Sequence, residues 1–257
     1  MQCLGLGGVC LILASGEIMK NTMEPRANPV VWLAVMIAGV LAVTAGIVPA
    51  VAEVPAELTY QVSHSVFGDI GTYTNKVEPT RDGATVQTRA HFEVKVLGVK
   101  MHREDAERTE RWQGNRLVSF RGVTDKGNGP AEVKGEARGN SFVITTPEGG
   151  TINAPWSVHP ANPWSSNFLH SNTMMRPDTG KLEQVQINPG QETSVQIDGA
   201  NVPAVKYEVS GSTKYTVWLD GHGVPVKFIC DDDTGKVTFT LAKCAGCNAE
   251  VSQLNRK

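Results

Sequence analysis

A strict alternation of polar and apolar side chains over residues 84–96 constrains the fold of this 257-residue chain more than any other feature. The even positions carry Ala84, Val86, Thr88, Ala90, Phe92, Val94 and Val96, and every odd position between them is polar. Successive side chains of a β-strand point to opposite faces, so a period of two predicts a long strand with one buried and one wet face.

Shorter segments repeat this alternation along most of the chain. They are residues 58–66, 205–209, 215–219, 226–230 and 237–241. Turn sequences such as Asp82-Gly83, Gly139-Asn140 and Asp198-Gly199 separate the runs. Because short links join antiparallel neighbours, the chain is predicted to be all-β, an antiparallel meander of about 10–12 strands judged from the usual spacing of turn signals.

The first break in the pattern is residues 101–111, which are dense in charges of both signs. We interpret this segment as a wet or edge strand, because edge charges discourage pairing between sheets. The sequence from Trp112 to Leu117 then predicts a hairpin that turns at Gly114-Asn115.

The second break is residues 154–180, which contain four prolines and several large apolar side chains. An irregular stretch of this length is often a lid or a binding loop, and its apolar side chains should be buried. Ser165 or Ser166 is expected to cap a short helix that runs to about Met175. The ligand-binding residues predicted from this segment are Trp156, Trp164, Phe168, Met174 and Met175.

An uncharged apolar segment, residues 30–52, follows Arg26 and ends in Ala50-Val51-Ala52. A basic flank, an apolar stretch and small residues before the cut are the parts of a secretory signal. We therefore expect cleavage after Ala52 and a periplasmic protein, with Met23 as the true start and residues 1–22 as a mis-called extension. An uncleaved membrane anchor is the alternative, since about 20 apolar residues cross a bilayer.

The expected organisation is thus a signal with its extension over residues 1–52, a β domain over 53–243 and a polar tail over 244–257. The net charge of −2 and the lack of a basic stripe argue against nucleic acid as a partner. Without a run of like charge, membrane contact is expected only through the signal segment, if that segment is retained.

Few residues suggest chemistry. Cys244 and Cys247 have the spacing of a thiol redox motif, but they follow the last alternating run, so a local disulfide or two loose tail thiols are favoured over redox function. Asp231, Asp233 and Gly235 resemble the start of a calcium loop, but Ala242 stands where the closing Glu belongs. The six histidines show no close zinc-type pair, although His159 and His170 share the irregular segment. We expect no catalytic residue, no metal and no cofactor.

The order of several short motifs resembles a known family. These motifs are Gly68-Asp69-Ile70-Gly71, Trp112 to Leu117, Asn162-Pro163-Trp164, Asp178 to Leu182, and Trp218-Leu219-Asp220 followed by Gly223 to Val226. Over about residues 56–242 this order resembles a family of uncharacterised exported proteobacterial proteins. The resemblance implies a fold similar to the periplasmic lipoprotein carriers, a half-open antiparallel barrel around a helical plug. It implies no activity, and no carrier-specific binding residue maps onto this chain.

Three functions are compatible with this sequence. The first is a non-enzymatic periplasmic binding or carrier protein for an apolar ligand, such as a lipid or a lipidated partner, held in the concave side of the sheet. The second is a structural or interaction module of the cell envelope with a filled interior. The third is an enzyme on a β-barrel scaffold, which titratable groups inside the concavity would favour.

Overall fold

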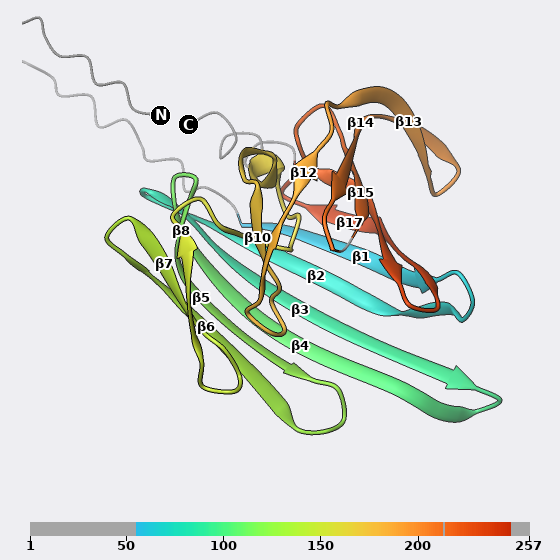
Figure 1. Cartoon of the computed structure of the whole chain (residues 1–257). Helices are drawn as coiled ribbons and strands as arrows, with labels where there is room; N and C mark the ends of the chain where they lie inside the picture. The colour runs from blue at the N-terminus through green and yellow to red at the C-terminus, as the bar shows by residue number, and fades with distance from the viewer. Residues whose placement is uncertain (1–54, 213, 248–257) are drawn as a thin grey trace, which may run out of the picture. The chain divides into compact units, whose positions relative to one another are not determined.

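The computed structural model describes residues 55–212 and 214–247, which form two meanders joined by an irregular segment (Figure 1). The first meander comprises β1 (Ala56–His64), β2 (Gly68–Thr80), β3 (Gly83–Val96), β4 (Val99–Gln113), β5 (Arg116–Asp125), β6 (Pro130–Arg138), β7 (Ser141–Thr145) and β8 (Thr151–Pro155). The second comprises β12 (Gln186–Ile187), β13 (Gln191–Ile197), β14 (Ala200–Ser210), β15 (Tyr215–Leu219), β16 (Pro225–Asp232) and β17 (Gly235–Ala245).

One 14-stranded antiparallel sheet combines the two meanders. The last described strand, β17, pairs with the first, β1, so the two meanders join in the middle of the sheet. The strand path ends at β12 on one side and at β8 on the other, and these two do not pair. The sheet is therefore a half-open barrel, as expected.

Residues 156–185, here called the plug, connect the meanders. The plug contains β9 (His159–Pro160), the 3-10 helix η1 (Ser166–His170), β10 (Thr173–Met175) and β11 (Leu182–Gln184), and its three strands form a small separate sheet. The described residues contain 17 strands, more than the number expected. Strands of two or three residues such as β9 to β12 are too short to show alternation in the sequence.

The position expected for the charged segment at residues 101–111 is wrong in part. It belongs to β4, which pairs with β3 along its length but with β5 only from Asp105 onward, so residues 105–111 lie inside the sheet and residues 101–104 at a free edge. Its wet face is real, because Glu107 and Arg111 are exposed. Charges on one face of a strand leave its backbone free to pair on both sides, which is why residues 105–111 need not lie at an edge.

The expected boundary of the C-terminal tail also needs correction. Strand β17 continues to Ala245 and places Cys244 opposite Leu58 of β1. Residues 242–245 are exposed, so the burial pattern stops before the backbone pairing does. Cys244 and Cys247 form a disulfide with Cα atoms 5.7 Å apart, which is one of the two states expected from the sequence.

The expected signal segment, residues 1–52, and the end of the tail, residues 248–257, lie outside the described residues. Within the part that is described, no helix has the length and apolar character needed to cross a membrane.

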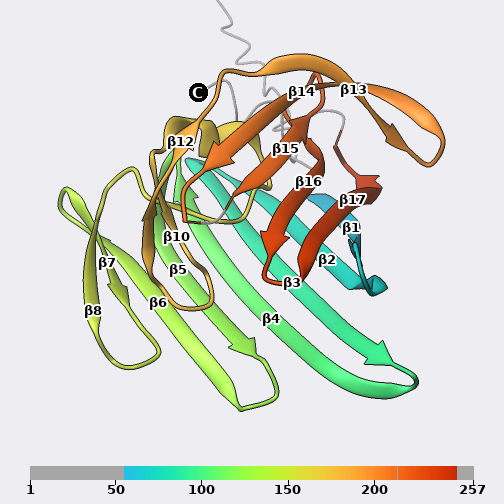
Figure 2. The same ribbon diagram turned by 45° about the vertical axis from the view of Figure 1, so that its right-hand side comes forward.

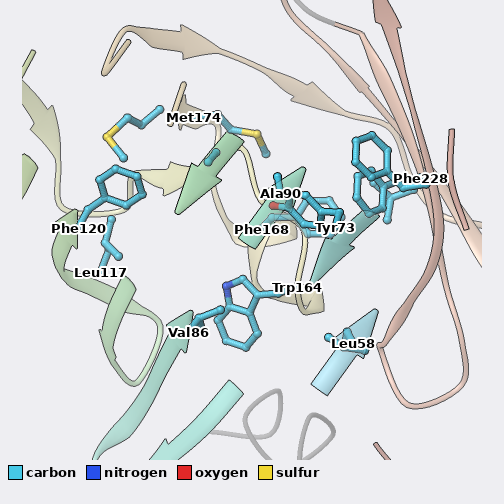
Figure 3. Close-up of a cluster of buried hydrophobic side chains, with 14 of the residues drawn as sticks. Leu58, Tyr73, Val86, Ala90, Leu117, Phe120, Trp164, Phe168, Met174 and Phe228 are labelled. Atoms are coloured by element: carbon cyan, nitrogen blue, oxygen red, sulfur yellow. The ribbon is translucent and has the colours of Figure 1, made fainter. Parts of the chain in front are cut away.

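Aromatic side chains fill much of the inner side of the sheet (Figure 3). Phe228 and Phe239 stack with ring centroids 4.1 Å apart, and Tyr73 meets both rings edge to face. Burying each such ring contributes roughly 1.5–3 kcal/mol to folding. This aromatic group forms one side of the space into which the plug inserts.

Candidate functional site

The plug brings most of the predicted ligand-binding residues into the interior. Trp164, Phe168, Met174 and Met175 are all buried and belong to the main hydrophobic cluster (Figure 3). Trp156 is different, because 49 % of it is exposed. It follows β8 directly and precedes the first buried plug residue, Val158, so the chain has not yet turned inward at that point.

Ser165 is the N-terminal cap of the short helix η1, and it is one of the two serines expected in that role. Its hydroxyl accepts a hydrogen bond from the Asn167 backbone N–H at 3.2 Å, which satisfies a donor that a helix start leaves free. The helix ends at His170 and not near Met175. The reason is tertiary, since Met174 and Met175 pair as β10 with β9 and β11.

A group of buried polar side chains holds one end of the plug. We call it the polar anchor, and its members are Tyr73, Asn75, Thr88, Glu110, Trp112, Asn162 and Trp164. Its sheet residues come from β2, β3 and β4, and its two plug residues flank Pro163. The register sets Asn75 opposite Thr88 and Val86 opposite Glu110, so neighbouring strands present these groups on the same inner face.

Asn162 lies at the centre of the polar anchor. Its amide oxygen accepts hydrogen bonds from the Tyr73 hydroxyl at 2.7 Å and from the Asn75 amide at 3.2 Å. Its own NH₂ group donates to Thr88 Oγ1 at 3.0 Å and to Glu110 Oε1 at 2.8 Å. An Asn side chain has two donors and room for two acceptor bonds, so Asn162 uses its full capacity.

Glu110 is a carboxyl group with no exposed surface. Its second oxygen, Oε2, accepts from the indole N–H groups of Trp112 at 2.9 Å and Trp164 at 3.1 Å. Burial raises the pKa of Glu110, and the N–H donors of Asn162 and the two tryptophans oppose that rise. Three donors on one carboxyl make it a fixed attachment point for the plug.

His159 packs beside the polar anchor. Its ring lies 4.5 Å from the Trp112 ring, centroid to centroid, and 5 % of the residue is exposed. Burial, with a smaller contribution from His170, lowers the pKa of His159 to about 3. The imidazole is therefore neutral at neutral pH. The backbone of His159 in β9 lies opposite that of Met174 in β10.

The geometry of the polar anchor is better suited to holding the plug in place than to catalysing a reaction. Both oxygens of Glu110 and all polar atoms of Asn162 already have partners inside the protein. Within residues 55–212 and 214–247, no three His, Cys, Asp or Glu side chains gather in a way that could hold a metal ion. Cys230 is a free thiol whose pKa is raised to about 12, mainly by burial, so it stays protonated and unreactive at neutral pH.

Two of the hollows in the described chain lie at hairpin ends. One of about 560 Å³ lies between the β5–β6 turn and the β7–β8 turn, with Asn128, Pro130 and Thr146 in its wall. The other, of about 380 Å³, lies around Asp82 and Trp112. Neither has a plug residue, Glu110 or His159 in its lining.

Sequence reasoning missed the polar anchor, and above all Glu110. A signal was present, because positions 106, 110 and 112 share one parity and Ala106 and Trp112 are apolar. Counting back by two from Trp112 places Glu110 on the inner face. The density of charge in this segment concealed that alternation.

The fold is similar to that of a solved protein, given as "Crystal Structure of Beta-barrel-like Protein of Domain of Unknown Function DUF1849 from Brucella abortus". The two share 12% sequence identity with a TM-score of 0.57, over 76% of this chain and 98% of that chain. At this identity the likeness concerns the fold alone. No curated protein matches the sequence.

A family match covers most of the β domain. The Domain of unknown function (DUF6134) matches residues 67–242, which include the plug and all members of the polar anchor. This finding confirms the expected membership in an uncharacterised family of β-proteins. The chain therefore belongs to the family described as Domain of unknown function (DUF6134).

Proposed function

We propose that this protein is an exported, non-enzymatic module of the cell envelope, whose half-open barrel is permanently filled by its own plug and which acts through its surface. The observation that carries this proposal is the complete hydrogen bonding of Asn162 inside the barrel. A lid that opens to admit a ligand would have to break four buried hydrogen bonds at this residue, and each unpaired buried group costs about 1–3 kcal/mol.

Export is the part of the proposal that rests on sequence. Residues 30–52 have the composition of a secretory signal, and Ala50-Val51-Ala52 supplies the small residues that precede a cleavage site. The proposed location is the periplasm.

Titratable groups inside the concavity would favour an enzyme, and Glu110 and His159 are such groups. Their environment supports a structural role. The oxygens of Glu110 accept from protein N–H groups, Glu110 has no exposed surface, and only 5 % of His159 is exposed. A catalytic carboxyl group needs access to its substrate.

A carrier of an apolar ligand is the second candidate, because the polar anchor holds the plug only at residues 162–164. From Phe168 to Met175 the large buried side chains, Phe168, Met174 and Met175, are apolar and belong to the main hydrophobic cluster. Moving that part of the plug aside would expose the aromatic rings of Tyr73, Phe228 and Phe239 to a lipid or a lipidated partner. The similarity to lipoprotein carriers inferred from the sequence belongs to this candidate.

Two measurements test these candidates, and only the first separates one from the other. The first is mass spectrometry of an organic extract of the purified protein, together with titration of a fluorescent fatty acid. A permanent plug predicts no lipid in stoichiometric amount and no saturable uptake of the probe. A bound lipid, or uptake approaching one probe per chain, would establish the carrier and refute the permanent plug.

The second measurement is the stability of Trp164→Ala. For a permanent plug we expect a loss of about 3–5 kcal/mol in the free energy of unfolding, as for other large-to-small core substitutions. Trp156→Ala is the matched control, because Trp156 is half exposed and should leave stability within about 0.5 kcal/mol. A Trp164→Ala variant as stable as that control would contradict the filled interior.

A further inference from the structure

The β3–β4 hairpin extends past the strands on either side of it (Figure 2). Pairing of β3 with β2 ends where Phe92 faces Gly71, and pairing of β4 with β5 ends where Asp105 faces Asp125. Residues 93–104 thus form a two-stranded ribbon with no further strand beside it in the described chain. We call residues 93–104 the ribbon.

The end of the ribbon is apolar and exposed. Leu97 is 99% exposed, and Val96, Val99 and Met101 are also exposed. The described chain exposes seven large apolar residues, and six of them lie at this end of the sheet, since Val66 and Phe67 belong to the β1–β2 turn. Strands β1 and β3 run in the same direction, which brings their two turns to the same side (Figure 1). Apolar groups gathered in this way mark an interaction site.

The conformation of the β3–β4 turn does not explain why position 97 is a leucine. Leu97 and Gly98 form a two-residue turn with φ values of 51° and 80°. The Asp198-Gly199 turn of the same chain has nearly the same geometry, with φ values of 47° and 80°. Such turns favour Asn or Asp at the first position, whereas a leucine there is strained. The ribbon therefore carries an exposed apolar side chain where a polar one would suit the fold better.

Basic side chains lie directly behind the apolar end. Lys95 and Lys100 face each other across the ribbon, an arrangement of like charges that weakens a strand pair. Glu93 bridges both, with each Nζ 2.5 Å from a carboxylate oxygen. Arg103, which pairs with Asp105, adds a third basic residue, so the ribbon carries one more positive than negative charge.

We propose that this hairpin end inserts into the surface of a lipid bilayer that contains anionic headgroups. Val96, Leu97 and Val99 would enter the acyl region, while Lys95 and Lys100, the next pair along the ribbon, would lie at the level of the phosphates. A few side chains at one hairpin end offer much less surface area than the roughly 800 Å² per partner that a stable protein interface buries. Insertion into a bilayer does not require a contact area of that size. The inference goes beyond the proposed function and does not depend on the state of the plug.

The test is flotation of the processed chain, recovered from the periplasm, with vesicles of phosphatidylglycerol and phosphatidylethanolamine or of phosphatidylcholine alone. We expect binding to the anionic vesicles that weakens with salt. Leu97→Asn removes the apolar group without changing charge and suits the turn, so the fold should persist while the partition coefficient falls about tenfold or more. Lys95→Gln with Lys100→Gln should abolish the preference for anionic vesicles. Trp156→Ala, an exposed apolar residue beyond the end of β8, should bind like the wild type.

A chain that retains residues 30–52 would bind any vesicle, so hydrogen exchange provides the second readout for the full chain. Amides of the ribbon should be protected on anionic vesicles and not on phosphatidylcholine. Equal vesicle binding by wild type and Leu97→Asn would overturn the proposal, as would unchanged exchange of the ribbon. Self-association of the wild type that Leu97→Asn abolishes, without vesicle binding, would assign the hairpin to a second copy of the chain and would also overturn it.

Discussion

Replacing Asn162 by alanine tests the central role of the polar anchor. The substitution leaves three buried groups without their partner: the Tyr73 hydroxyl, the Asn75 NH₂ and Glu110 Oε1. Thr88 keeps its bond to Asn75 Oδ1, and Glu110 Oε2 keeps both indole donors. An unpaired buried group costs about 1–3 kcal/mol, and water that enters the space left by the side chain recovers part of this. We expect a loss of about 3–5 kcal/mol.

The assay is equilibrium unfolding in urea, followed by tryptophan fluorescence and by circular dichroism. Asn172→Ala is the matched control, because Asn172 is an exposed asparagine of the same plug whose side chain makes one long hydrogen bond, 3.2 Å, with Thr173. It should change stability by less than about 1 kcal/mol. A loss below about 1 kcal/mol for Asn162→Ala would show that the hydrogen bonds of Asn162 do not hold the plug, and the proposed permanent filling would lose its main support.

Three further predictions concern acid stability, the C-terminal disulfide and processing. The pKa of His159 is about 3 in the folded chain and near 6.5 when unfolded, so its contribution is complete above pH 6.5 and is lost as the pH falls. Between pH 7 and pH 5 the wild type should lose about 2 kcal/mol more than His159→Phe, measured by urea unfolding at both pH values; equal losses would mean that the imidazole is protonated without difficulty in the folded chain. Replacing both Cys244 and Cys247 by serine should lower the free energy of unfolding by at most about 2 kcal/mol, because the disulfide closes a very short loop; failure to fold, seen by circular dichroism, would show that this end of β17 is essential. N-terminal sequencing of the periplasmic protein should begin at Glu53, and recovery of the intact chain in the membrane fraction alone would refute cleavage after Ala52.

Local patterns were sufficient for the strands and for the character of the plug. Alternation over residues 84–96 predicted β3, and the hairpin after Trp112 lies where its turn residues place it. Trp164, Phe168, Met174 and Met175 are buried, as the apolar composition of this segment indicated. These inferences succeed because strand periodicity and turn chemistry depend on residues that are close in the sequence.

The failures have different origins. Met175 was expected in a helix but lies in β10, which pairs with the nearby strands β9 and β11, and residues 105–111, interpreted as a wet or edge strand, lie between β3 and β5, the neighbours of β4 along the chain. Only the pairing of β17, which continues beyond its buried residues, depends on a partner far away in the sequence, β1.

The sequence by itself determined that this chain forms an antiparallel β meander with one apolar, irregular segment, because side-chain period and turn residues are encoded locally. The tertiary structure decided what that segment is. Asn162 meets Tyr73, 89 residues away, and Glu110, 52 residues away, only after strand register has aligned β2, β3 and β4 beneath the plug. A carboxyl group that reads as part of a charged surface strand becomes a buried acceptor because its face of the sheet is covered, and coverage is a property of the assembled fold.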